Sequence, residues 1–418
     1  MTGTHNPEPS LSTQLTELTE TTPGNQPGAS TQAVHAGRRA NAYHSLIEPL
    51  VQTATYTFEN TADLRRFMEY RLWGPVEGRT EYGRYGNPTI AAVEARLAAL
   101  EGAGDALLFA SGMAAITTTL MALLSSGDHV VLTDDCYRRT RQFCQAYLAR
   151  WGIACSVVET GDYAALERAI RPETRLLVSE SPTNPYLRVL DLERFVKIAR
   201  QHHVKTLVDA TFATPFNLRP LEWGVDLVVH SATKYLGGHN DLLAGSVAGD
   251  TYEIAPIRET LGVIGSVSDP HNAALLLRGL KTLGLRIERQ NRNGQAVAEF
   301  LESHPAVERV WYPGLTSHPD HQLAVEQMKG YGGVVSFTVR GDLEATAGVV
   351  DSLRIPLIAT SLGGAESLVS QPALMSYFDL SSEERLAIGM RDNLIRLALG
   401  IEDTADLLAD LDQALKSI

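Results

Sequence analysis

Short apolar runs that alternate with helical stretches constrain the fold of this chain more than any other feature. Each run is followed by a polar loop and then by a segment of helical character. Strands that are apolar on both faces and alternate with helices are typical of a mostly parallel sheet in an α/β domain. The runs are ALLFA (106–110), HVVLT (129–133), RLLVSE (175–180), VKTLVDA (204–210) and DLVVHS (226–231).

Four regions follow from the change of pattern along the chain. Residues 1–30 are rich in Thr, Pro and Glu, lack Lys and Arg, and predict a disordered, solvated tail. Residues 31–86 show no apolar stripe and predict an extended arm. Residues 87–285 form the α/β domain, which opens with a helix that has Pro88 in its first turn and stops at Gly102.

The last region, residues 286–418, has a different pattern. Its apolar runs GGVVSFTV (332–339) and NLIRLAL (393–399) are separated by several amphipathic helices. This arrangement predicts a second, smaller α+β domain. We expect a helix near residues 275–295 to bridge the two domains.

The charge balance and the cysteines restrict the class of protein. There are 36 Lys and Arg against 49 Asp and Glu, a net charge of −13, which argues against a nucleic-acid or membrane-surface partner. Three cysteines without a C-x-x-C pair favour a reducing compartment. No apolar run is long enough to cross a bilayer, and a start without Lys or Arg does not fit a targeting peptide. We therefore expect a cytoplasmic protein.

Candidate chemistry gathers in the loops after the predicted strands, where open parallel sheets bind ligands. Lys234 lies just past a buried strand, where desolvation can make a lysine a nucleophile or a Schiff-base former. Asp209 ends another strand and needs a cation or donor, such as the ring nitrogen of pyridoxal phosphate. A solvated lysine and a capping aspartate are the ordinary alternatives.

Further residues would complete a cofactor and substrate site. Ser111, Gly112 and Met113 follow a strand and open a helix, which suits a phosphate. Tyr137 could stack on an aromatic ring or pack in the core. Arg396 lies in an apolar run, where a substrate carboxylate or an internal salt bridge would satisfy it. Together these signals predict a pyridoxal-phosphate enzyme that acts on an amino acid.

Two other classes of site are disfavoured. No strand runs into a G-x-G-x-x-G segment, which argues against an NAD dehydrogenase. His318 and His321 in SHPDH are separated by a proline and lack a third ligand in register, so we predict solvent-facing loop histidines and no metal site.

The motifs YGRYGNPT, SGM, ESPTNP, DATFATP, HSATKYLGGHND and SLGGAESL occur in an order and spacing that resemble the Cys/Met-metabolism family of pyridoxal-phosphate enzymes. The segments TDDCYRRTRQF, YPGLTSHPDH and QPALMSYFDL resemble its plant-type cystathionine γ-synthase branch. The resemblance covers the chain from about Thr31 onward. It implies an aspartate aminotransferase-like, fold type I large domain.

The resemblance also implies residue roles. Lys234 would form the Schiff base, Asp209 would pair with the ring nitrogen, and Tyr137 would stack on the ring. The remaining cofactor contacts would come from Gly112, Met113, Thr211, Ser231 and Thr233, and from Tyr82 and Arg84 of a neighbouring subunit. The substrate would be held by Arg396, Ser361, Asn184 and Glu366. Tyr82 or Tyr137 would assist Lys234 in proton transfer, and a homodimer, doubled to a tetramer, would be the active assembly.

The implied reaction is replacement of the γ-substituent of an O-phospho-, O-succinyl- or O-acetylhomoserine by cysteine, which gives cystathionine for methionine biosynthesis. Arg138 and Arg139 follow the stacking tyrosine and would attract an anionic leaving group or form a solvated helix face. Arginine at position 139, where methanethiol-releasing lyases have cysteine, counts against a methionine γ-lyase. Cystathionine γ-lyase, an O-acylhomoserine sulfhydrylase, a γ-substitution enzyme of specialised metabolism and a non-catalytic scaffold protein stay open as alternatives.

Overall fold

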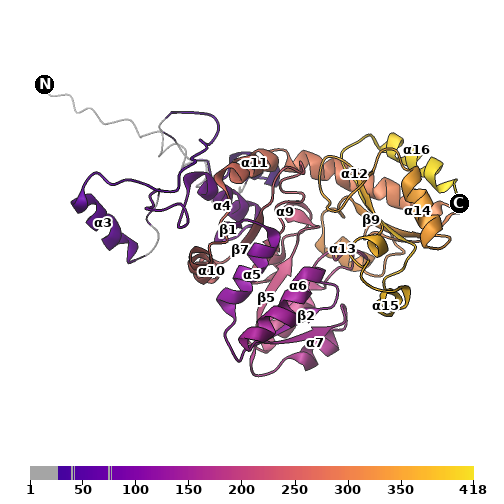
Figure 1. The fold of residues 1–418 in the computed structure, drawn as a ribbon, viewed down its shortest axis with the longest axis horizontal. Coiled ribbons are helices and arrows are strands. Elements are labelled where there is room, and N and C mark those ends of the chain that lie inside the picture. Colours follow the sequence, from indigo (N-terminus) through magenta and orange to yellow (C-terminus); the bar gives the residue numbers. More distant parts are fainter. Residues whose placement is uncertain (1–26, 39–40, 42, 74–75, 77) are drawn as a thin grey trace.

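The computed structural model describes residues 27–38, 41, 43–73, 76 and 78–418. Residues 1–26, which carry most of the predicted tail, lie outside the described residues. The described chain forms two sheets with helices around them, and the segment before α4 extends to one side of this body (Figure 1). In the described part, no helix combines the length and the apolar character needed to span a membrane.

The larger sheet has seven strands in the order β1-β7-β6-β5-β4-β2-β3. The five strands from β6 to β3 are parallel, whereas β7 runs antiparallel to both of its neighbours. The bounds are β1 Asp105–Phe109, β2 His129–Thr133, β3 Ala154–Val158, β4 Thr174–Glu180, β5 Lys205–Asp209, β6 Leu227–His230 and β7 Gly245–Gly249. The predicted mostly parallel α/β sheet is therefore confirmed.

Both faces of this sheet are covered, which explains the continuous apolar runs. On one face, Leu176 and Val178 of β4 pack with Ile116 of α5. On the other face, Leu177 packs with Phe195 of α8. The helices of this part are α4 Pro88–Glu101, α5 Gly112–Leu123, α6 Arg138–Gln142, α7 Tyr163–Ala169, α8 Leu192–Gln201, α9 Thr214–Asn217, α10 Thr251–Ile264 and α11 Pro270–Leu280.

The smaller sheet has five strands in the order β10-β11-β12-β9-β8, all antiparallel neighbours except β10 and β11. The strands are β8 Val307–Trp311, β9 Val334–Val339, β10 Leu357–Ile358, β11 Leu368–Ser370 and β12 Leu394–Ala398. The accompanying helices are α12 Leu283–Ser303, α13 His321–Gln327, α14 Leu343–Ser352, α15 Ser382–Ala387 and α16 Thr404–Leu415. This is the α+β arrangement expected for the C-terminal region.

The arm is not wholly extended, because it contains two helices, α2 Ala29–His35 and α3 Thr61–Arg71. In α3 only Asp63 and Phe67 are buried, so its apolar stripe is too narrow to reveal a helix in the sequence. The Asn60 side chain caps α3, and Arg79 forms an ion pair with Asp63. Polar interactions therefore stabilise this helix where apolar packing is scarce.

The bridge between the two sheets also differs in detail from the prediction. The expected single helix near residues 275–295 is two helices, α11 and α12, with Lys281 and Thr282 between them. The proposed domain boundary at 285/286 falls in the first turn of α12, which runs from the larger sheet toward the smaller one (Figure 1).

Candidate active site

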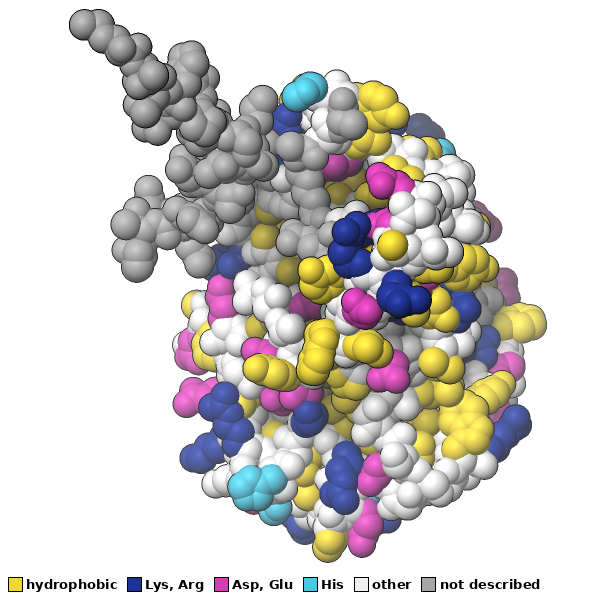
Figure 2. All heavy atoms as spheres, turned by 90° about the vertical axis from the view of Figure 1, so that its left-hand side faces the viewer, with side chains coloured by type: hydrophobic (Ala, Val, Ile, Leu, Met, Phe, Trp, Pro, Cys, Tyr) yellow, Lys and Arg dark blue, Asp and Glu magenta, His cyan; other side chains and the backbone are white. Residues whose placement is uncertain are grey.

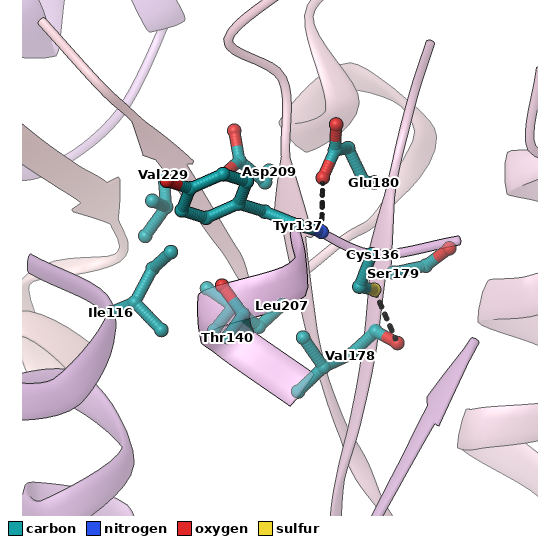
Figure 3. Close-up of a pocket in the computed structure, with 10 residues that line it drawn as sticks. All are labelled: Ile116, Cys136, Tyr137, Thr140, Val178, Ser179, Glu180, Leu207, Asp209 and Val229. Carbon is teal, nitrogen blue, oxygen red and sulfur yellow. Dashed lines mark hydrogen bonds between the residues drawn. The ribbon is translucent and has the colours of Figure 1, made fainter. Parts of the chain in front are cut away.

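The carboxyl ends of the parallel strands meet at one edge of the larger sheet, and the predicted cofactor residues gather there. Asp209 is the last residue of β5, and Glu180 is the last residue of the adjacent β4. Lys234 lies in the 231–244 connection between β6 and β7. Tyr137 immediately precedes α6 and lines the same pocket as Glu180 and Asp209 (Figure 3).

The Lys234 amine is held in a state suited to proton transfer. Its Nζ donates a hydrogen bond of 2.6 Å to the Oγ of Ser361, which belongs to the C-terminal region. Burial lowers the pKa of Lys234 to about 8, and the positive charge of Arg396 adds to this effect. A substantial part of the amine is therefore neutral near physiological pH.

The Asp209 carboxylate is arranged to receive a partner. Its Oδ1 accepts hydrogen bonds from the Thr211 hydroxyl at 2.5 Å and the Thr211 backbone N–H at 3.0 Å. Among the described residues, none donates a hydrogen bond to Oδ2. Burial raises the pKa of Asp209, and the two Thr211 bonds act against this rise by stabilising the charged form.

Tyr137 lies at the mouth of the pocket with its ring between Asp209, Val229 and Ile116 (Figure 3). The side chain is 45% exposed, so one part of it stays accessible to a ligand. Its backbone N–H donates a 2.8 Å hydrogen bond to Oε2 of Glu180, which anchors the start of α6 to β4.

The predicted phosphate residues converge where the 231–244 connection meets the start of α5. A side chain at Gly112 would place its Cβ only 2.8 Å from the Cβ of Ser231, so only glycine fits without a shift. The N–H groups of Gly112 and Met113 belong to the first turn of α5, which has no carbonyl partner within the helix. The Thr211 hydroxyl accepts the Ser231 N–H at 2.8 Å.

Thr233 has a mainly structural contact in this structure. Its hydroxyl donates to the Ala244 carbonyl at 3.1 Å and accepts the Ala244 N–H at 2.9 Å. These bonds close the connection that carries Lys234. The predicted phosphate contact of Thr233 stays a prediction.

Arg396 of β12 faces two of the residues predicted to bind substrate. Its Nη1 donates to Oδ1 of Asn184 at 3.1 Å, and its Nη2 donates to the Ser361 carbonyl at 2.9 Å. Its buried Nε has no hydrogen-bond partner in the described part of the chain. Burial lowers the pKa of Arg396 to about 10. No acidic side chain pairs with this guanidinium among the described residues, so the salt bridge considered as an alternative is absent there.

Glu366, the fourth predicted substrate residue, is exposed, and its Oε2 accepts a 2.8 Å hydrogen bond from Nδ2 of Asn240. Asn240 belongs to the same connection as Lys234. Helix α12 contacts both segments, since Arg286 donates to the Tyr235 carbonyl at 2.7 Å and Gln290 donates to the Gly364 carbonyl at 2.8 Å.

Tyr82 and Arg84 lie on the arm and are not joined to Lys234 by any contact in the described chain. Arg84 donates to the carbonyl of Gly262 near the end of α10, and its guanidinium lies 5.5 Å from the ring centre of Tyr82. Their predicted contact with the phosphate of a neighbouring subunit therefore stays a prediction.

The residues of this pocket fit pyridoxal phosphate. The free Oδ2 of Asp209 suits a protonated ring nitrogen, and the Tyr137 ring suits stacking. Gly112 lets the start of α5, with its free N–H groups, approach Ser231 closely, and Lys234 supplies a partly neutral amine. Each of these features meets a different part of the cofactor.

Glu180 was missed by sequence reasoning, although it contacts Tyr137 directly. Its signal was a charged residue at the end of the apolar run RLLVSE, the same signal that pointed to Asp209.

The prediction of a solvent-facing His318 is wrong, because its side chain is only 3% exposed. Its Nε2 interacts with the Tyr186 carbonyl at 3.3 Å, so a polar partner inside the fold compensates for burial. Within the residues that the structure describes, no group of three or more His, Cys, Asp or Glu side chains is placed to hold a metal ion.

Comparisons with known proteins agree with this geometry. The family model described as Cys/Met metabolism PLP-dependent enzyme matches residues 30–416. Cystathionine gamma-synthase 1, chloroplastic, of Arabidopsis thaliana is 49% identical over 92% of this chain and 68% of its own length. L-methionine gamma-lyase of Pseudomonas putida is 43% identical over 94% of this chain and 98% of its own.

A solved structure supports the same assignment. The crystal structure of metB from Corynebacterium glutamicum matches with a TM-score of 0.86 and 38% sequence identity, covering 94% of this chain and 98% of the other. This match confirms the predicted fold type I architecture. The chain is therefore a member of the Cys/Met metabolism family of pyridoxal-phosphate-dependent enzymes.

Proposed function

We propose that this enzyme is a cystathionine γ-synthase, which replaces the γ-substituent of an activated homoserine ester by cysteine. One observation carries the proposal: Ser361 links the Lys234 amine, through its hydroxyl, to the Arg396 guanidinium, through its carbonyl. A proton-transfer group and a carboxylate-binding group thus lie side by side. An α-amino acid needs both groups within reach, one for its carboxylate and one for the proton at Cα.

The chain's own residues divide the work. Arg396 and Asn184 orient the substrate carboxylate, and Lys234 moves the protons at Cα and Cβ, assisted by Tyr137 or by Tyr82 of a second copy. Pyridoxal phosphate, when bound, stores the electron pair released at the substrate carbon. The ester oxygen leaves Cγ with its bonding pair, and the cysteine thiolate forms the new C–S bond there. Charge and atoms balance when one proton returns to Cα and one to Cβ.

The arginines after Tyr137 support an anionic ester. Arg138 forms an ion pair with Asp379 at 2.6 Å, so its charge is compensated. Arg139 is exposed, and within the described chain its side chain donates a hydrogen bond only to the neutral Gln142 side chain, at 2.7 Å. Its positive charge also acts on Asp379, whose pKa it helps to lower. We propose that Arg139 nevertheless favours a phosphorylated or succinylated substrate over an acetylated one.

The proposal is tested by offering the purified holoenzyme O-phospho-, O-succinyl- and O-acetylhomoserine, each with and without cysteine. Formation of cystathionine from one ester is the expected result and identifies the leaving group. Release of 2-oxobutyrate from cystathionine without any synthesis would replace the proposal by a cystathionine γ-lyase. Homocysteine formed with sulfide, but no cystathionine with cysteine, would indicate a sulfhydrylase.

The relatives include both synthases and lyases. The plant synthases of Arabidopsis thaliana and Nicotiana tabacum are 49% and 48% identical over 92% of this chain, against 43% for the Pseudomonas putida lyase, which supports a synthase. Position 139 is arginine in this chain, whereas methanethiol-releasing lyases have cysteine there. We propose that this side chain lies near the leaving group.

We further propose that the assembly is a homodimer, doubled to a tetramer. Large hydrophobic side chains are exposed on the arm, among them Tyr43, Leu46 and Ile47. Hydrophobic patches also lie between the charged side chains on the face that Figure 2 shows. A second copy would cover such surface and receive Tyr82 and Arg84. Sedimentation analysis of the holoenzyme tests this, and a monomer would contradict it.

We propose a reducing compartment, such as the cytoplasm, because Cys136, Cys144 and Cys155 are all unpaired thiols. The two plant synthases named above are described as chloroplastic, so localisation of the tagged chain in its own cell decides the compartment.

A further inference from the structure

Three carboxylates lie close together at the carboxyl ends of neighbouring strands, and the site described above uses only Asp209. Asp135 follows β2, Glu180 ends β4 and Asp209 ends β5, in the sheet order β5-β4-β2. Glu180 and Asp209 are direct partners in the β4–β5 register. Glu180 is buried, and the other two are half-buried.

Glu180 connects the two residues that would contact the cofactor ring. Its Oε2 accepts the Tyr137 backbone N–H at 2.8 Å, and it lines the same pocket as Asp209. Figure 3 shows Glu180 beside the Tyr137 backbone nitrogen and Asp209 near the Tyr137 ring. A change at Glu180 would therefore act on both ring contacts at once.

The charges that face Glu180 disfavour a second negative charge. Asp209 on β5 and Asp135 after β2 are acidic, and the Cys136 thiol lies beside them. Arg141 on α6 is the cation that acts on Glu180, but no ion pair joins the two in the described chain. Burial raises the pKa of Glu180 well above its usual range, and the charges of Asp209 and Asp135 raise it further.

The hydrogen bonds decide which carboxyl group keeps the charge. Asp209 accepts two donors from Thr211, which stabilise its ionised form. Glu180 accepts a single donor, the Tyr137 N–H, which a neutral carboxylic acid accepts as well through its carbonyl oxygen. Its Oε1 has no hydrogen-bond partner among the described residues and is available to carry the proton.

We infer that Glu180 is a positioning residue that holds the Tyr137 backbone as a neutral carboxylic acid and so leaves Asp209 as the charged partner of the cofactor ring. The inference rests on the cofactor assignment and not on the substrates of the proposed function. Asp209 keeps its negative charge because the neighbouring Glu180, being neutral, does not repel it.

The protonation state is measured by infrared difference spectroscopy of the holoenzyme against its Glu180→Gln variant. We expect the wild type to show the carbonyl stretch of a protonated carboxyl group, which the variant lacks. A loss of carboxylate stretches instead would overturn the inference. Glu253→Gln, which alters an exposed ion pair with Lys205 at the opposite end of β5 from Asp209, serves as the matched control.

The positioning role is measured by the dissociation constant of pyridoxal phosphate in reconstituted enzyme. Glutamine keeps a carbonyl acceptor for Tyr137, so Glu180→Gln should change the constant by less than about threefold, while Glu180→Ala should raise it about tenfold or more. Equal losses in both variants, or none in Glu180→Ala, would refute the positioning role. If Glu180→Ala does not fold, as thermal denaturation would show, the glutamine variant and the infrared result still decide. Neither readout requires turnover, so failure here is distinct from failure of the synthase assay.

Discussion

The lowered pKa of Lys234 has a measurable kinetic consequence for cofactor attachment. Only a neutral amine attacks the aldehyde of pyridoxal phosphate. Burial and Arg396 lower the pKa of Lys234 from 10.5 to about 8. At pH 7.5 about a quarter of the amine is then neutral, against about one part in a thousand for an unperturbed lysine. The environment of Lys234 should therefore raise the attachment rate about two-hundredfold.

The assay follows the visible absorption that appears when dialysed apoenzyme is mixed with pyridoxal phosphate at a series of pH values. We expect the rate constant to rise about tenfold per pH unit below pH 8 and to level off above it. Replacing Arg396 by methionine removes a neighbouring cation and should move the midpoint to higher pH. Arg340→Met, at an exposed position, is the control and should leave the midpoint unchanged.

A rate that keeps rising through pH 10 would refute the reasoning, because it would mean that Lys234 titrates like a solvated lysine. A midpoint near 8 that Arg396→Met does not move would instead place the whole effect in burial.

Three further predictions address substrate binding, cofactor binding and domain contact. Arg396→Lys loses the planar fork and should raise the steady-state KM about tenfold or more; an unchanged KM would show that another group binds the carboxylate. Gly112→Ala places a Cβ 2.8 Å from that of Ser231 and should weaken pyridoxal phosphate binding about tenfold, and unchanged affinity in an equilibrium titration would contradict this. Arg138 and Asp379 form an ion pair in which the aspartate side chain is 64% exposed. A double-mutant cycle with Arg138→Gln and Asp379→Asn should therefore give a coupling free energy of unfolding below about 1 kcal/mol. A larger coupling would be inconsistent with solvent screening of the pair.

The parallel strands β2, β4, β5 and β6 could be predicted because most of their residues are buried. The edge strand β3 was missed, since only its last residue is buried. HVVLT is β2 without any shift, and its five residues are all buried. Strand β7, Gly245–Gly249, was missed because its glycines and serine give no apolar run. It nevertheless lies inside the sheet, between β1 and β6. Small residues allow close approach there, since a Cβ at Gly245 would clash with the Ser111 carbonyl oxygen.

The same reason separates the site residues that the sequence reveals from those that it does not. Lys234 and Asp209 stand out because a charged group beside a buried strand has few explanations. Glu180 carries the same signal but was not read, since its partner is a backbone N–H that no sequence pattern displays. The paired contacts of Arg396 with Asn184 and Ser361 join residues 212 and 35 positions apart, which only the fold brings together.

Helix α12 has a consequence for how substrates are distinguished. Its hydrogen bonds to the carbonyls of Tyr235 and Gly364 hold the segments that carry Lys234 and Ser361. The helix therefore fixes the distance between the Lys234 amine and the group that binds the carboxylate. The distance from Cα to the carboxylate is the same in every α-amino acid, so α12 fixes the part of the site that binds what all substrates share. The choice among homoserine esters then depends on side chains that α12 does not position, and we propose Arg139 as one of them. Substrate preference can therefore change within this family through the side chains near the γ-substituent, while the amine and the carboxylate-binding group keep their positions.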